Sequence, residues 1–74
     1  MFEKGCRYYL TLGNRTRMYG RYEGPAMVDG RPGARFSDGA QVLETGARTR
    51  VGEFTVALAD VRSSGLAPLQ DVDL

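Results

Sequence analysis

The amino-acid sequence predicts an all-β protein, either a small, strongly bent antiparallel sheet or a five-to-six-stranded barrel. Ten glycines divide the 74 residues into segments of strand length rather than helix length. Several segments alternate apolar and polar side chains, which is the two-residue period of a strand with one buried face. We expect one domain over residues 1–65, because a chain of this length builds a single core, and a flexible C-terminal tail over residues 66–74.

The first two expected strands, Cys6–Leu12 and Thr16–Tyr22, form a hairpin whose loop length decides which way each side chain points. A two-residue loop would pair leucines with arginines and bring charge onto the apolar face. A three-residue loop, Gly13–Arg15, instead pairs Leu10 with Met18. Since a slip of one residue moves every side chain to the other face, the apolar pattern predicts the three-residue loop or an equivalent bulge.

The segments that follow are shorter and contain more turn-forming residues. Residues 23–33 include two prolines, and we interpret them as a long loop with a short strand near Met27 and Val28. Residues 54–62 also fit a helical period, but their β-branched and aromatic start favours a strand that ends in one helical turn at 59–62. The further strands are expected at residues 34–36, 40–44, 47–51 and 53–58, with turns at residues 37–39, 45–46 and 51–52. Residues 63–65 are a plausible helix end.

Charge is distributed unevenly along the chain although the net charge is only +1. Residues 1–35 carry a net charge of +4 and residues 36–74 a net charge of −3. Such an asymmetry suggests a local basic binding patch. Codon composition would explain why arginine outnumbers lysine nine to one, but it does not explain why arginines stand beside tyrosines.

The outer face of the expected first hairpin combines arginine and tyrosine. The face opposite the leucines holds Thr11 and the five candidate binding residues Arg7, Tyr9, Arg17, Tyr19 and Arg21. Arginine binds phosphate and tyrosine stacks on bases, so this face suits single-stranded RNA or DNA. The same residue types are enriched in protein interfaces, so a protein partner or self-assembly through this face is the alternative. A cross-strand tyrosine pair in a merely structural role is the third reading.

A short sequence, Gly-x-Arg-Thr-Arg, occurs twice, at residues 13–17 and 46–50. Two arginines separated by one residue of a strand point to the same side. The second copy therefore adds Arg48 and Arg50 to the candidate binding residues.

Other functional classes have little support in the sequence. There is no histidine, and the single cysteine, Cys6, has no partner for a disulfide or a zinc site. No nucleophile stands beside an evident base, so we expect no enzyme, no metal and no cofactor. The chain lacks a signal-like or membrane-spanning apolar run, which together with the lone cysteine predicts a cytoplasmic protein. Because so small a core is marginal, we expect a homo-oligomer or a partner-bound module.

The spacing Leu10-x-Leu12-x-Asn14, followed by Gly20-x-Tyr22, resembles the first motif of the Sm-like proteins. More broadly, the pattern resembles SH3-like small β-barrels. This resemblance implies a five-stranded barrel with a sharp bend at Gly20, closed by a strand within residues 54–61, and ring-like association. The loop and C-terminal signatures with which Sm-like proteins bind RNA are absent, so those binding residues have no counterparts here.

Overall fold

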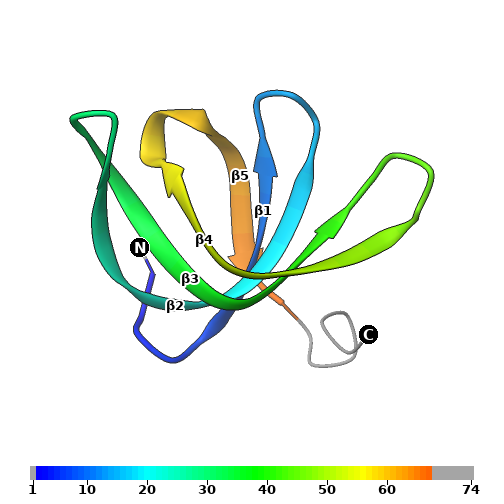
Figure 1. The fold of residues 1–74 in the computed structure, drawn as a ribbon, viewed down its shortest axis with the longest axis horizontal. Helices are drawn as coiled ribbons and strands as arrows, with labels where there is room; N and C mark the ends of the chain where they lie inside the picture. Colours follow the sequence, from blue (N-terminus) through cyan, green and yellow to red (C-terminus); the bar gives the residue numbers. More distant parts are fainter. Residues whose placement is uncertain (1, 68–74) are drawn as a thin grey trace.

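The computed structural model describes residues 2–67 as five antiparallel strands in one curved sheet (Figure 1). The order across the sheet is β4-β3-β2-β1-β5. The predicted all-β class is confirmed. The strands are β1 (Arg7–Leu12), β2 (Arg17–Val28), β3 (Arg31–Val42), β4 (Arg48–Ala57) and β5 (Val61–Leu66), and a 3-10 turn, η1 (Leu58–Asp60), joins the last two.

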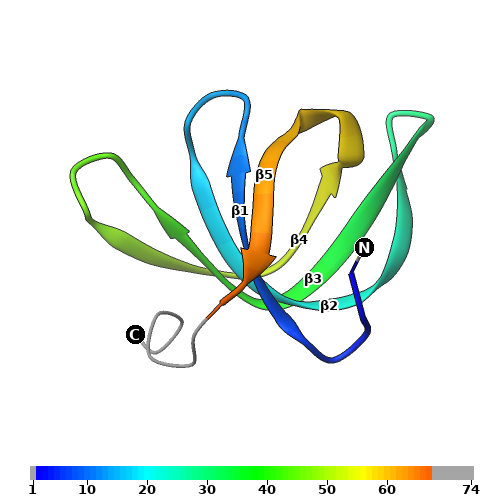
Figure 2. The same ribbon diagram turned by 180° about the vertical axis from the view of Figure 1, so that it is seen from behind.

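The sheet is strongly bent but open. The long strands β2 and β3 curve across the whole molecule, and the turns between successive strands rise on the same side of it (Figures 1 and 2). The turn η1 leads from β4 to β5, which are the two outer strands of the sheet. Within residues 2–67 these two strands do not pair, so the expected bend is present without closure of the sheet.

The register of the first hairpin is the predicted one. Leu10 lies opposite Met18. The backbone N–H of Leu12 donates to the carbonyl of Thr16 at 2.9 Å, and the N–H of Arg15 donates back to the carbonyl of Leu12 at 2.9 Å. These two bonds close the three-residue loop that keeps the leucines of β1 on the apolar face.

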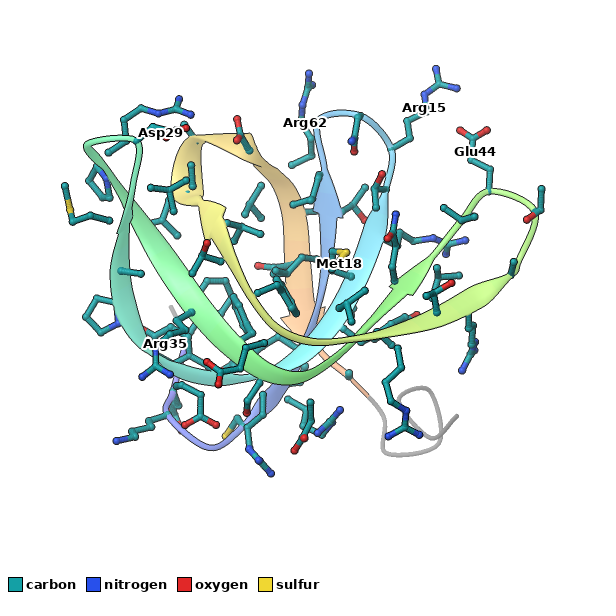
Figure 3. All side chains as sticks on the ribbon, viewed as in Figure 1. Arg15, Met18, Asp29, Arg35, Glu44 and Arg62 are labelled. Atoms are coloured by element: carbon teal, nitrogen blue, oxygen red, sulfur yellow. The ribbon has the colours of Figure 1, made fainter. Side chains whose placement is uncertain are left out.

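The inner, concave face holds the core. Leu10 and Phe36 are completely buried, and Figure 3 shows Met18 pointing into the same interior. The cluster also contains Tyr8, Ala34 and Val56, and the partly buried Cys6 and Tyr22 pack against it as expected. Burial of such side chains contributes roughly 1.5–3 kcal/mol each.

The bend at Gly20 makes room for an aromatic stack. Phe36 and Phe54 stack with ring centroids 5.1 Å apart. A Cβ at Gly20 would lie 2.8 Å from the Phe54 ring and 2.9 Å from Phe36, which is closer than two carbon atoms can approach. The pairing of β2 with β3 shifts register between Tyr19 and Arg21, on either side of this glycine. The predicted bend is therefore confirmed.

The prediction of a long loop at residues 23–33 was wrong. Strand β2 continues to Val28 and returns through Asp29 and Gly30, which have φ of 52° and 77°. Positive φ at both central residues is the type I′ turn for which Asp-Gly is a strong signal. Pro25 and Pro32 are tolerated because β2 has no neighbour on its other side beyond Tyr22 and β4 pairs with β3 only from Gly33 onward.

Two further predicted turns are bulges inside continuous strands. Residues 37–39 belong to β3 and residues 51–52 to β4, and the register shifts at both places. A bulge adds one residue without ending the pairing, so it resembles a turn in sequence. The helical turn expected at 59–62 forms one residue earlier, at Leu58–Asp60.

Strand β5 was not predicted. Ser63, Ser64 and Gly65 suggested a helix end, yet they pair with β1 in the sheet. The free edge of β1 supplies the hydrogen bonds, and sheet context overrides weak strand propensity. Leu66 ends this strand, and the remainder of the expected tail, residues 68–74, lies outside the described residues.

Candidate nucleic-acid interface

The strand register brings the two outward tyrosines into one row across the sheet. Directly opposed residues of antiparallel strands point to the same side. Tyr9 lies opposite Tyr19, Tyr19 opposite Ala40, and Ala40 opposite Arg50. On the other side of β1, Tyr9 lies opposite Gly65. We call this line the tyrosine row.

A second row lies two residues closer to the β1–β2 turn. Thr11 is opposite Arg17, Arg17 opposite Val42, and Val42 opposite Arg48. We call it the arginine row. Both rows lie on the outer face of the sheet, opposite the core, because Leu10 and Met18 between them point inward.

A third row holds the remaining predicted residues. Arg7 is opposite Arg21, and Arg21 is opposite Ser37. We call it the clamped row. All seven residues predicted from the sequence therefore belong to one outer face. The two arginines of the second Gly-x-Arg-Thr-Arg copy lie on β4, and β3 separates them from the first hairpin.

The Tyr9 ring is held against the sheet by its glycine neighbour. A Cβ at Gly65 would lie 2.8 Å from two atoms of the Tyr9 side chain, so the ring covers the glycine. An aromatic side chain over a cross-strand glycine is a stable pairing in sheets. Tyr9 and Tyr19 are both half-buried, and each keeps part of its surface accessible.

Arg17 and Arg50 are the cations of these two rows that no other described residue engages. Both are exposed, and neither forms a hydrogen bond or ion pair with another residue in the described part of the chain. Arg48 is also exposed on this face. The tyrosine and arginine rows thus present aromatic surface beside positive charge.

The clamped row differs from the other two rows, because acidic residues of the protein accept hydrogen bonds from its arginines. Arg21 donates from Nη2 to Oδ2 of Asp38 at 2.7 Å and from Nε to Oε2 of Glu23 at 3.2 Å. The Ser37 hydroxyl donates to the same Glu23 oxygen. These hydrogen bonds, first that of Ser37 and then that of Arg21, hold the pKa of the Glu23 carboxyl below its ordinary value.

Arg7 is held through the backbone of the same segment. Its Nη2 donates to the carbonyl oxygen of Asp38 at 2.9 Å. Its Nε is buried and has no hydrogen-bond partner in the described part of the chain. Asp38 therefore engages both arginines of the clamped row, one through its carbonyl and the other through its carboxylate.

Sequence reasoning missed Glu23, Ser37 and Asp38 as parts of this surface. Asp38 was assigned to a turn, whereas it lies in a bulge of β3 with φ of 50°. Aspartate tolerates this left-handed conformation better than most residues, which is the only sequence signal that pointed to it.

A separate hollow of about 330 Å³ lies beside the turns, lined by Leu12, Gly13, Asn14 and Asp60. Asn14 uses its Oδ1 to accept from the backbone N–H of Thr16. None of the predicted binding residues lines this hollow.

Comparison with known proteins adds no relationship, since no protein-family model and no curated sequence matches the chain.

Within residues 2–67, no group of three or more histidine, cysteine or acidic side chains is arranged to hold a metal ion. The same residues form no helix long and apolar enough to cross a membrane. The fold and its outer face define a small open-sheet protein with a basic and aromatic surface.

Proposed function

We propose that this protein binds single-stranded nucleic acid on the outer face of its sheet, through the tyrosine and arginine rows. One observation carries the proposal. The strand register places Tyr9, Tyr19 and Arg50 in one row with Arg17 in the next row, and the two arginines have no partner in residues 2–67.

The chemistry of the two rows suits a flexible polyanion. Stacking of a base on an aromatic ring contributes roughly 1–3 kcal/mol and tolerates any base. Guanidinium groups bind phosphate oxygens through two parallel hydrogen bonds. Aromatic rings and cations on a sheet face favour binding of single strands, whose bases are free to stack. Among residues 2–67 there is no α-helix that could enter the major groove of a duplex.

The salt dependence of binding tests this proposal. Affinity for a fluorescent oligothymidylate is measured between low and physiological salt for the wild type and for Arg17→Ala with Arg50→Ala. Loss of two phosphate contacts lowers the slope of log affinity against log salt by about 0.7 for each contact. The charge-matched control is Arg31→Ala with Arg62→Ala. Arg31 is the first residue of β3 and Arg62 lies at the start of β5 (Figure 3), and neither belongs to the tyrosine row or the arginine row.

The control pair leaves the slope close to that of the wild type if the outer face is the site. If both double variants lower the affinity and the salt slope equally, binding depends on net charge alone and not on the outer face. Absence of binding by the wild type at low salt would overturn the proposal.

Self-association is the second candidate, through the same face or along the edges of the sheet. The edges are a candidate because the outer edges of β4 and β5 have no partner strand among the described residues. Unpaired edges are templates for pairing with another chain. Light scattering separates the two candidates, because Tyr19→Ser changes the mass in solution only if the tyrosine row is an interface between copies.

A further inference from the structure

The clamped row already contains an anion that belongs to the protein. The Asp38 carboxylate accepts from Arg21 at 2.7 Å, and the Asp38 carbonyl accepts from Arg7 at 2.9 Å. Two guanidinium groups that converge on one acidic residue resemble the arrangement in which proteins hold a phosphate. The clamped row lies one row from the tyrosines, about 7 Å along the strands.

The two carboxylates of this cluster differ in how firmly they are held. Glu23 is 24% exposed and accepts from both Ser37 and Arg21, and its lowered pKa keeps it ionised at neutral pH. Asp38 is 62% exposed and its carboxylate has one partner, Arg21. Asp38 is therefore the more easily displaced of the two.

The backbone at Asp38 also favours displacement. It lies in the bulge where the β2–β3 register shifts, between the pairs Arg21–Ser37 and Tyr19–Ala40. A bulged residue is not locked by a regular ladder on both sides. A change at Asp38 therefore leaves the pairing of the neighbouring residues intact.

The arginines of the clamped row remain incompletely satisfied. Within residues 2–67, the buried Nε of Arg7 has no acceptor, and the hydrogen bond of this side chain is the one to the Asp38 carbonyl oxygen. A phosphate group offers more acceptor oxygens than the single carbonyl and carboxylate supplied by Asp38.

We propose that Asp38 competes with phosphate for Arg7 and Arg21. Asp38 accepts hydrogen bonds from these two arginines until a nucleic-acid strand displaces it. This inference rests on the proposed function of the outer face. Arg17 of the arginine row and Arg50 of the tyrosine row make the first contacts, because neither has a partner among the described residues. A phosphate of the bound strand then replaces the Asp38 carboxylate on Arg21, so a strand that reaches all three rows is selected over a shorter anion.

The variant Asp38→Asn tests the inference. Asparagine tolerates positive φ, so the bulge keeps its conformation. Removing the competing charge tightens binding of an oligothymidylate of about 10 nucleotides roughly fivefold. It also steepens the salt slope by about 0.7, for one added phosphate contact. The matched control is Glu44→Gln, which removes the same charge at the tip of the β3–β4 hairpin, where Glu44 lies near Arg15.

A third measurement assigns the gain to Arg21. In the Arg21→Ala background, Asp38→Asn gives no tighter binding than Glu44→Gln does. If the wild type binds and Asp38→Asn behaves like Glu44→Gln in both affinity and slope, the competitor role is overturned while the proposed function stands. If neither the wild type nor Asp38→Asn binds at low salt, the proposed function fails and the inference fails with it.

Discussion

The β1–β2 and β3–β4 hairpins close with the same turn but differ in what supports them. In the first, Leu12 and Thr16 close a loop whose third residue, Arg15, has φ of 68°. In the second, Leu43 N–H donates to the carbonyl of Ala47, and Gly46, with φ of 90°, takes the equivalent place. The Gly-x-Arg-Thr-Arg copies are thus offset by two residues relative to their turns.

The surroundings of the two hairpins differ more than their turns. The first has β5 on one side and β3 on the other, and its inner face lies in the core. The second ends in an edge strand, and residues 43–53 are all exposed. The same type of turn therefore closes a buried hairpin in one place and an exposed hairpin in the other. The neighbouring strands, rather than the turn residues, account for this difference in burial.

The largest expected contrast is between two leucine truncations. Leu10→Ala removes a completely buried side chain and lowers the free energy of unfolding by about 2–5 kcal/mol. Leu43→Ala removes a side chain that is 43% exposed and changes it by less than about 0.5 kcal/mol. Urea denaturation measures both. Equal losses would show that the β3–β4 hairpin is as well packed as the first.

A smaller effect is expected from exchanging the left-handed turn residues. Gly46→Ala places a Cβ at positive φ and destabilises the fold by about 1 kcal/mol, whereas Arg15→Gly relieves the same strain and stabilises it by roughly 0.5–1 kcal/mol. Thermal unfolding of both variants measures the two shifts.

The control for Arg15→Gly is Glu44→Gln, which breaks the same exposed Arg15–Glu44 ion pair at 4.0 Å. Such a pair contributes little, so this variant is expected to match the wild type. Shifts of the same sign for Gly46→Ala and Arg15→Gly would contradict the equivalence of the turns.

The smallest expected effect is the pH dependence that Glu23 confers on the clamped row beside the first hairpin. Its pKa is lower in the folded protein than the ordinary value of 4.5, so the folded state binds fewer protons than the unfolded state in this range. The stabilisation is complete above pH 4.5 and is lost as pH falls from 4.5 through the lowered pKa.

Unfolding curves at pH 6 and at progressively lower pH are compared for the wild type and Glu23→Gln to measure this effect. We expect the difference between the two proteins to shrink as pH falls below 4.5. A difference that grows on acidification would contradict the sign of the pKa shift.

The strand class, the three-residue first loop and the side to which each residue of the first hairpin points can all be predicted from the amino-acid sequence. These features depend on local alternation, since only one register keeps Leu10 and Met18 together on the apolar face. The bend at Gly20 was also predictable, because a glycine inside a strand marks a close approach.

The strand pairing beyond the first hairpin, and the acidic partners of the arginines, depend on the tertiary structure. Strand β5 forms because β1 offers it a free edge, and Asp38 engages Arg7 and Arg21 because a bulge in β3 carries it across to them. The contacts of Asp38 with Arg21 and Arg7 join residues 17 and 31 positions apart in the chain, and their formation depends on register shifts that leave no local pattern. The alternation of side chains is a local property, whereas the partner of each charge is a property of the assembled sheet.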